Sequence, residues 1–306
     1  MDNTTPQRLT DFEPSKEFFI GIDSDGCAFD TMEIKHKECF IPNIICSFGL
    51  QPISKFARDA AEFVNLYSQW RGTNRFPALQ RVLDLLERHP DVRERGFSLP
   101  RLPAFRQWLA NEAKPSNPAL QAAIAQSNGD AGAELKHVLA WSTAVNATIT
   151  ETVYGIPPFP HVRECLEKAA PRADIIVVSA TPIEALQREW DEHDIARFTA
   201  LIAGQELGTK KEHLQVTTAG RYPTGHVLMI GDAPGDMKAA RANDALFFPI
   251  NPGDEARSWQ LLRDEALERF FAGTYAGDYE AALIAEFERH LPSEPPWEGE
   301  APAEPA

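Results

Sequence analysis

The amino-acid sequence predicts an α/β protein in which a doubly wound, three-layer parallel sheet carries an inserted all-helical domain. The apolar run Phe18–Ile22, which ends abruptly in a polar turn, indicates a buried strand. Between residues 33 and 152 the apolar residues recur at helical spacing without a convincing strand pattern. After Gly155 short apolar runs alternate with helical patterns, which is typical of βαβ units and a parallel sheet.

The second part of the chain supplies the remaining elements of the sheet. We predict strands at residues 174–178, 199–203, 227–230 and 245–250, and helices at 161–169, 183–193, from about Lys211, and at 236–242. The first strand must join this sheet, because a strand standing alone cannot satisfy its backbone groups. The helical block is therefore an insertion, and two further helices, at residues 255–271 and 279–290, complete the fold.

These patterns divide the chain into three parts. We expect a discontinuous catalytic core at residues 15–32 and 153–290, and a helical cap domain at residues 33–152. Residues 291–306, rich in Pro, Glu and Ala with one Trp, are expected to form a disordered tail.

Composition limits the possible partners. With 45 acidic against 30 basic residues, the net charge of -15 argues against nucleic-acid binding, which needs a basic surface. No apolar run reaches the roughly eighteen residues of a membrane span, and the N-terminus has no signal-peptide pattern, so we expect a cytoplasmic protein without a membrane partner.

The four cysteines show no metal-binding spacing, and we expect Cys27, Cys39, Cys46 and Cys165 to be free thiols that pack in the core. A monomer and a homodimer are both compatible with the sequence.

Polar residues follow three of the predicted strands at the point where each strand ends. They are Asp23 and Asp25, then Ser179 and Thr181, then Asp232 and Asp236. In a parallel sheet these ends share one edge, where ligands bind. Four converging carboxylates repel one another unless a cation lies among them, and hard oxygen ligands favour Mg²⁺. The alternative is that these acids only cap local turns and the helix near Asp236.

In their order, these motifs resemble those of the haloacid dehalogenase (HAD) superfamily. The matching elements are Asp23-x-Asp25-Gly26 after a strand, Ser179 after a second, a lysine at a helix start, and Gly231-Asp232-x-x-x-Asp236 after another. The resemblance covers residues 17–32 and 155–250, and the family has a helical cap where the insertion lies, as in β-phosphoglucomutase-like members. Cys27 departs from the family pattern, which usually has Thr there, and we expect Cys27 to pack, with the neighbouring acids suppressing its thiolate.

The resemblance implies a Mg²⁺-dependent phosphohydrolase with a covalent intermediate. Asp23 would be the nucleophile that forms an aspartyl-phosphate, and Asp25 the general acid and base. Asp23, the Asp25 carbonyl and Asp232 would bind Mg²⁺, with Asp236 as a further ligand or a partner of one. Ser179 would donate to a phosphoryl oxygen. Gly26 and Thr181 are expected to lie against the substrate.

The family's lysine has two candidates here. Lys210 and Lys211 are adjacent, so on a helix they point about 100° apart and only one can face the site. We favour Lys210, because Lys210-x-x-x-Leu214 matches the family spacing, and Lys211 stays open as a substrate contact.

Within the cap, residues 70–76 are the candidate substrate-recognition segment. A Gly interrupts the helical pattern between Arg71 and Arg75, and the segment faintly resembles the recognition loop of β-phosphoglucomutase-like caps. Arg71, Asn74 and Arg75 are therefore expected to grip an anionic group of the substrate. The alternative is a solvated turn between cap helices.

Four functions are compatible with these residues. A phosphatase acting on a small phosphorylated metabolite accounts for all of them, and a phosphomutase of the β-phosphoglucomutase type would use the same groups with a sugar hydroxyl as acceptor. A haloacid dehalogenase would need neither Asp25 nor the acids at 232 and 236. A non-catalytic binding protein would not need the complete set of acids.

Overall fold

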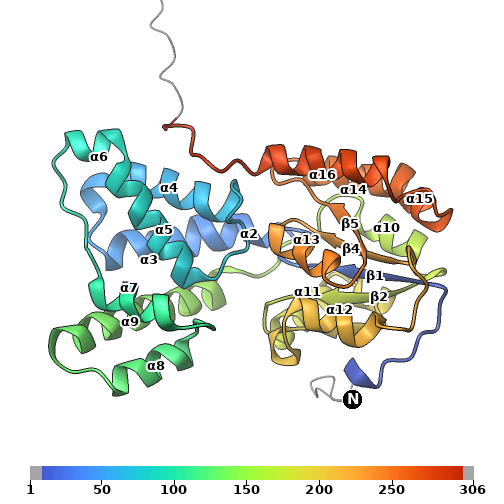
Figure 1. The fold of residues 1–306 in the computed structure, drawn as a ribbon, viewed down its shortest axis with the longest axis horizontal. Helices are drawn as coiled ribbons and strands as arrows, with labels where there is room; N and C mark the ends of the chain where they lie inside the picture. The colour runs from blue at the N-terminus through green and yellow to red at the C-terminus, as the bar shows by residue number, and fades with distance from the viewer. Residues whose placement is uncertain (1–8, 299–306) are drawn as a thin grey trace, which may run out of the picture. The chain divides into compact units, whose positions relative to one another are not determined.

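The computed structural model of the chain describes residues 9–298, which form two compact units (Figure 1). The core unit comprises residues 9–32 and 155–291, and the helical unit comprises residues 33–154 and 292–298. Each unit has a hydrophobic core of its own. Among the described residues, no helix combines the length and the apolar character that a membrane span requires.

The core unit is built on a five-stranded parallel sheet of order β3-β2-β1-β4-β5. Its strands are β1 (Phe18–Ile22), β2 (Ala173–Val178), β3 (Leu201–Ala203), β4 (Val227–Gly231) and β5 (Leu246–Pro249). Every residue of β1 is buried, which explains its continuous apolar sequence: a central parallel strand is covered on both faces. The predicted α/β fold is confirmed, and the first strand joins the sheet as expected, between the strands that end near Ser179 and Asp232.

Alternating side chains of β1 enter the hydrophobic clusters on opposite faces of the sheet. Phe18, Ile20 and Ile22 pack in one cluster, whereas Phe19 packs in the other. The first face is covered by α10 (Val162–Ala169), α11 (Ile183–Glu192), α14 (Glu255–Leu261) and α15 (Leu267–Phe271), and the second by α12 (Lys210–Thr218), α13 (Pro234–Arg241) and α16 (Asp278–His290). The result is the three-layer arrangement that a doubly wound sheet requires.

The helical unit contains only helices and connections among its described residues. They are α3 (Ile41–Ser47), α4 (Ser54–Leu66), α5 (Arg75–Arg88), α6 (Pro90–Glu94), α7 (Pro103–Asn111), α8 (Asn117–Ala125) and α9 (Gly129–Thr152). The short α2 (Thr31–Ile34) and the π-helical turn Lys35–Phe40 carry the chain into this unit. A second π-helical turn, Leu262–Ala266, joins α14 to α15 in the core unit.

The segment after α16 differs from the disordered tail expected for residues 291–306. Residues 292–298 belong to the helical unit, where the Trp297 ring lies 5.8 Å from that of Phe63 and 5.1 Å from that of His89. The Pro292 carbonyl accepts a hydrogen bond from the Gln69 amide, so both ends of the segment are attached. The ring of Trp297 supplies apolar contact area, although the composition of the segment as a whole predicted disorder. Residues 299–306 lie outside the described part of the chain.

The cysteines follow the expectation with one exception. All four are free, and Cys27, Cys39 and Cys165 are buried. Cys46 is exposed, because in α3 the buried positions are taken by Ile41, Ile44 and Ile45. The prediction that Cys46 packs in the core was wrong.

Candidate active site

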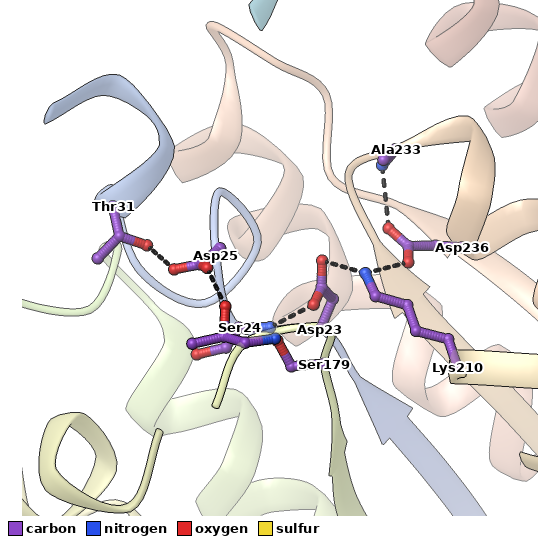
Figure 2. Close-up of polar contacts among 9 residues, drawn as sticks. Asp23, Ser24, Asp25, Thr31, Ser179, Lys210, Ala233 and Asp236 are labelled. Carbon is purple, nitrogen blue, oxygen red and sulfur yellow. Dashed lines mark hydrogen bonds and ion pairs between the residues drawn. The ribbon is translucent and has the colours of Figure 1, made fainter. Parts of the chain in front are cut away.

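The register of the sheet brings three polar strand ends to one edge. Ile22 pairs with Val177 of β2 and with Ile230 of β4, so Asp23 lies within one residue of the level at which Ser179 and Asp232 follow their strands. The Asp23 amide donates to the Ile230 carbonyl at 3.0 Å, which extends the ladder to this residue. The loops after β1, β2 and β4 therefore share one short stretch of the carboxyl edge, as Figure 2 shows for Asp23, Ser179 and Asp236.

Lys210 bridges two buried carboxylates at this edge. Its Nζ lies 2.7 Å from Oδ2 of Asp23 and 2.6 Å from Oδ1 of Asp236 (Figure 2). The side chains of Asp23 and Asp236 are 6% and 0% exposed, so these ion pairs lie largely out of water. Burial favours the neutral form of Lys210, but the two carboxylates outweigh it and raise the pKa of the ammonium group.

The charge of Lys210 does not balance the acids around it. Burial raises the pKa of the Asp23 carboxyl well above its ordinary value; Lys210 lowers it, while Asp236 and Asp232 raise it further. With Asp23, Asp232 and Asp236 ionised, three negative charges face one positive charge, which leaves a net charge of −2. Such a buried cluster calls for further positive charge.

The start of α12 explains why Lys210 rather than Lys211 faces Asp23. The Thr209 side chain accepts from the Glu212 amide, and Glu212 Oε2 accepts from the Thr209 amide at 2.7 Å, which fixes the first turn of the helix. Lys211, one residue on, is exposed. The helix start therefore selects Lys210, in agreement with the spacing argument.

Asp236 occupies space that only a glycine at position 231 leaves open. A Cβ at Gly231 would lie 2.4 Å from Cβ and 2.5 Å from Cγ and Oδ2 of Asp236. Oδ2 of Asp236 accepts from the Ala233 amide at 3.1 Å, which leaves Oδ1 for Lys210. The end of β4 and the first turn of α13 thus fit around this one carboxylate.

The Asp25 carboxylate is held by two hydroxyl groups. Thr31 donates to Oδ1 and Thr181 donates to Oδ2, each at 2.5 Å. Gly26 next to it has φ 74°, a left-handed conformation, and its amide donates to the Phe29 carbonyl at 2.8 Å. This turn directs the chain back over the end of β1. Thr181 contacts Asp25 directly, and Thr31 was not anticipated from the sequence, which carries no pattern that marks it.

Ser179 and Cys27 are both buried beside the acids. The Ser179 amide donates to the Ala203 carbonyl of β3, and its Oγ accepts from the Thr181 amide at 3.2 Å. Burial, followed by the nearby carboxylates, raises the pKa of the Cys27 thiol well above its ordinary value. The expected packing role of Cys27 is confirmed, although burial outweighs the neighbouring acids as the cause of the shift.

Three buried carboxylates can share one metal ion. One oxygen each of Asp23, Asp232 and Asp236 lies within 4.8 Å of the others. An all-carboxylate donor set suits a hard divalent cation. The residues present therefore fit the Mg²⁺ that the sequence motifs imply.

The cap arginines are used inside the helical unit. The Arg71 side chain is buried, and its Nη1 donates to the Leu66 carbonyl at 2.9 Å. Nη1 of Arg75 donates to Ser142 and Asn146, and burial lowers the pKa of Arg75 to about 10. Asn74 caps α5 by accepting from the Phe76 amide. Each of the three side chains thus has a structural contact within the helical unit, and helix packing buries Arg71 and partly buries Arg75, whereas Asn74 is exposed. Their predicted substrate binding stays a prediction.

Two tryptophans that sequence reasoning missed also contact the loop after β1. Nε1 of Trp190 donates to Ser24 Oγ at 3.0 Å, and Nε1 of Trp259 donates to the Cys27 carbonyl at 2.8 Å. Both lie in helices whose apolar pattern explains their burial, but nothing in that pattern indicates which loop they contact.

Comparison with known proteins gives similarity in structure alone. No protein-family model and no curated protein matches the chain. The chain is similar to the structure of a haloacid dehalogenase-like hydrolase from Streptococcus pneumoniae, at 15% identity and a TM-score of 0.42 over 88% of this chain and 98% of that chain. It is also similar to a protein described as a phosphoglycolate phosphatase from Lactobacillus delbrueckii, at 16% identity and a TM-score of 0.46 over 81% and 92% of the two chains. A third similar structure is described as a β-phosphoglucomutase from Bacteroides vulgatus, at 15% identity and a TM-score of 0.45 over 89% and 99%.

At such identities and TM-scores the similarity carries no argument about the activity of this chain. Its class follows from its own geometry: an α/β protein with a buried cluster of carboxylates and one lysine at the carboxyl edge of a parallel sheet.

Proposed function

We propose that the chain is a Mg²⁺-dependent phosphohydrolase of the HAD type that acts on a small phosphorylated metabolite through an aspartyl-phosphate on Asp23. The observation that carries this proposal is the Lys210 ammonium, which lies 2.7 Å from Asp23 within a set of three carboxylates able to share a metal ion. A nucleophilic carboxylate, a fixed positive charge and a cation site together are what phosphoryl transfer requires.

Each half of the reaction would use the same two aspartates. An oxygen of Asp23 attacks phosphorus, the bond from phosphorus to the leaving oxygen breaks, and that oxygen takes the proton of the Asp25 carboxyl. Asp25 then takes a proton from a water molecule whose oxygen attacks the same phosphorus. The bond between phosphorus and Asp23 breaks, which restores the Asp23 carboxylate and releases phosphate.

The contacts of Asp25 suit both protonation states. A hydroxyl group donates to a carboxylate and, after rotation, accepts from a carboxylic acid. Thr31 and Thr181 can therefore hold the group in one orientation while it loses and regains a proton. Lys210 would offset the charge of Asp23 and of the phosphoryl group, and Ser179 would donate to a phosphoryl oxygen.

Asp23, Asp232 and Asp236 would hold Mg²⁺, together with the Asp25 carbonyl that the family resemblance implies. When bound, Mg²⁺ would neutralise the phosphoryl oxygens and orient them for attack.

A hydrolysis screen tests the proposal. Phosphorylated sugars, nucleotides and amino-acid derivatives are incubated with the protein in Mg²⁺ or in EDTA, and free phosphate is measured. Release is expected only with Mg²⁺, and Asp23→Asn should lower kcat by at least about a thousandfold while the protein stays folded. Asp59→Asn, at an exposed position of α4, is the matched control and should retain activity. A folded Asp23→Asn variant with wild-type activity would sink the covalent mechanism.

The same screen separates the mutase alternative. Transfer of the phosphoryl group to a second sugar hydroxyl, with little free phosphate, would assign the acceptor as a sugar rather than water while leaving the role of Asp23 unchanged.

A further inference from the structure

Two buried indole groups hold the loop that carries both proposed catalytic aspartates. The loop runs from Asp23 to Phe29 at the end of β1. Trp190 from α11 donates to the side chain of Ser24, and Trp259 from α14 donates to the carbonyl of Cys27. Both tryptophans are 0% exposed. The two acceptors, Ser24 and Cys27, are three residues apart in the loop. The two donors come from helices on the same face of the sheet.

Ser24 is the residue between the two aspartates, and all its polar groups are engaged. Its amide donates to Oδ1 of Asp23 at 2.8 Å (Figure 2), and its carbonyl accepts from the Ala28 and Phe29 amides at 2.9 and 3.0 Å. Its Oγ accepts from Trp190 and donates to Glu189 at 3.3 Å. Ser24 is fully buried, so its rotamer and the backbone on either side of it are fixed by these contacts.

Burial of a tryptophan in this protein does not by itself bring a hydrogen bond. Among the described residues, the indole nitrogens of Trp108, Trp141 and Trp297 are buried without a hydrogen-bond partner, and all three lie in the helical unit. Trp190 and Trp259, in the core unit, both donate, and both donate to the loop after β1. The fold leaves these three indole groups unpaired, whereas both indole groups that reach the loop after β1 are paired there, so the loop is held by directed hydrogen bonds as well as by packing.

We propose that Trp190 is a positioning residue of the active site, with Trp259 as its counterpart at Cys27. The indole N–H of Trp190 fixes Ser24 Oγ, and Ser24 in turn fixes the Asp23 carboxylate through its amide and the direction in which the chain continues to Asp25. This role rests on the proposed function, because it is exerted on Asp23 and Asp25. Loss of the N–H would leave the substrate's binding groups in place and misalign the nucleophile and the acid, which lowers kcat more than it raises KM.

Trp190→Phe removes the N–H and keeps an aromatic ring, and Trp141→Phe is its matched control. Trp141 is 1% exposed and its indole nitrogen has no partner, so the control makes the same change in a buried site without breaking a hydrogen bond. Ser24→Ala removes the acceptor with a smaller change in volume, and it serves if Trp190→Phe does not fold. The readouts are kcat and KM for phosphate release with Mg²⁺, together with Tm.

Trp190→Phe and Ser24→Ala should each lower kcat about tenfold or more with KM within about threefold, and Trp141→Phe should keep kcat within about twofold. The variant that carries both changes should have a kcat no lower than that of the slower single variant, because both changes break the same hydrogen bond between Trp190 and Ser24. If kcat of Trp190→Phe and Ser24→Ala stays within about twofold of an active wild type, the positioning role is overturned and the proposed function stands. A wild type without Mg²⁺-dependent phosphate release from any phosphate ester overturns the proposed function and this role with it.

Discussion

Gly231→Ala provides the sharpest test of the site geometry. The added Cβ would lie 2.4–2.5 Å from three atoms of Asp236, closer than any van der Waals contact allows, so Asp236 must move. Its contacts with Lys210 at 2.6 Å and with the Ala233 amide at 3.1 Å would then be lost or weakened. Overpacking costs about 1–3 kcal/mol, and a buried hydrogen bond to a charged group about 1.5–3 kcal/mol. Together these costs predict a loss of about 3–5 kcal/mol in the free energy of unfolding.

Gly235→Ala is the matched control, four residues along the same loop and helix. No atom lies within 4 Å of a Cβ at this position, and Ala has the higher helix propensity, so stability should be unchanged or slightly greater. Thermal unfolding measured by circular dichroism should give Gly231→Ala a Tm about 10 °C below that of the wild type. The Tm of Gly235→Ala should equal that of the wild type. Equal melting temperatures for the two variants, with phosphate release retained in both, would refute the close fit between Gly231 and Asp236.

Two further predictions concern features away from the site. Asp174 accepts four hydrogen bonds, from the Ser15 amide and hydroxyl, the Lys16 amide and the Tyr222 hydroxyl. Burial alone would raise the pKa of Asp174, but these hydrogen bonds lower it below the ordinary aspartate value. Because the folded-state pKa is the lower one, this stabilisation is present above the unfolded-state pKa and is lost as pH falls through the folded one. Asp174→Asn should therefore cost about 2–3 kcal/mol in urea unfolding at pH 7 and progressively less below about pH 4, whereas a cost independent of pH would contradict the ionised state of Asp174. Chains ended after Leu291 should be about 2–3 kcal/mol less stable than chains ended after Glu298, because they lack Trp297; equal thermal unfolding of the two truncations would show that the Trp297 contacts contribute nothing.

Three polar residues of the site were predictable because each follows a strand end directly. They are Asp23, Ser179 and Asp232, and the carboxyl ends of parallel strands share an edge whatever the rest of the fold does. Lys210 needed one more step, because the capping box at Thr209 decides which of two adjacent lysines faces the acids. Local rules were sufficient for these residues.

The side chains that support the loop after β1 and the helical unit were not predictable, because their contacts depend on packing between distant segments. Trp190 lies 166 residues from Ser24, and Trp259 lies 232 residues from Cys27. Arg75 donates to the carbonyl of Ser142, 67 residues away on α9, and nothing in the sequence indicated this contact within the helical unit. In each case the residue type was visible in the sequence, whereas its partner depended on how helices pack.

The composition of the cluster itself argues for function over stability. Replacing a buried ionic group by well-packed apolar residues is often neutral or stabilising, so folding alone does not favour three carboxylates around one lysine. Here the backbone is shaped to accommodate the charges, since β4 ends in a glycine that admits Asp236 and α12 begins with a capping box that directs Lys210 toward it. A fold that needed only a core at this edge could have used an apolar side chain at position 236 and any residue at 231. A ligand that binds at this edge and supplies positive charge would account for the cluster, and the role that we propose for Asp23 as a nucleophile requires such a ligand.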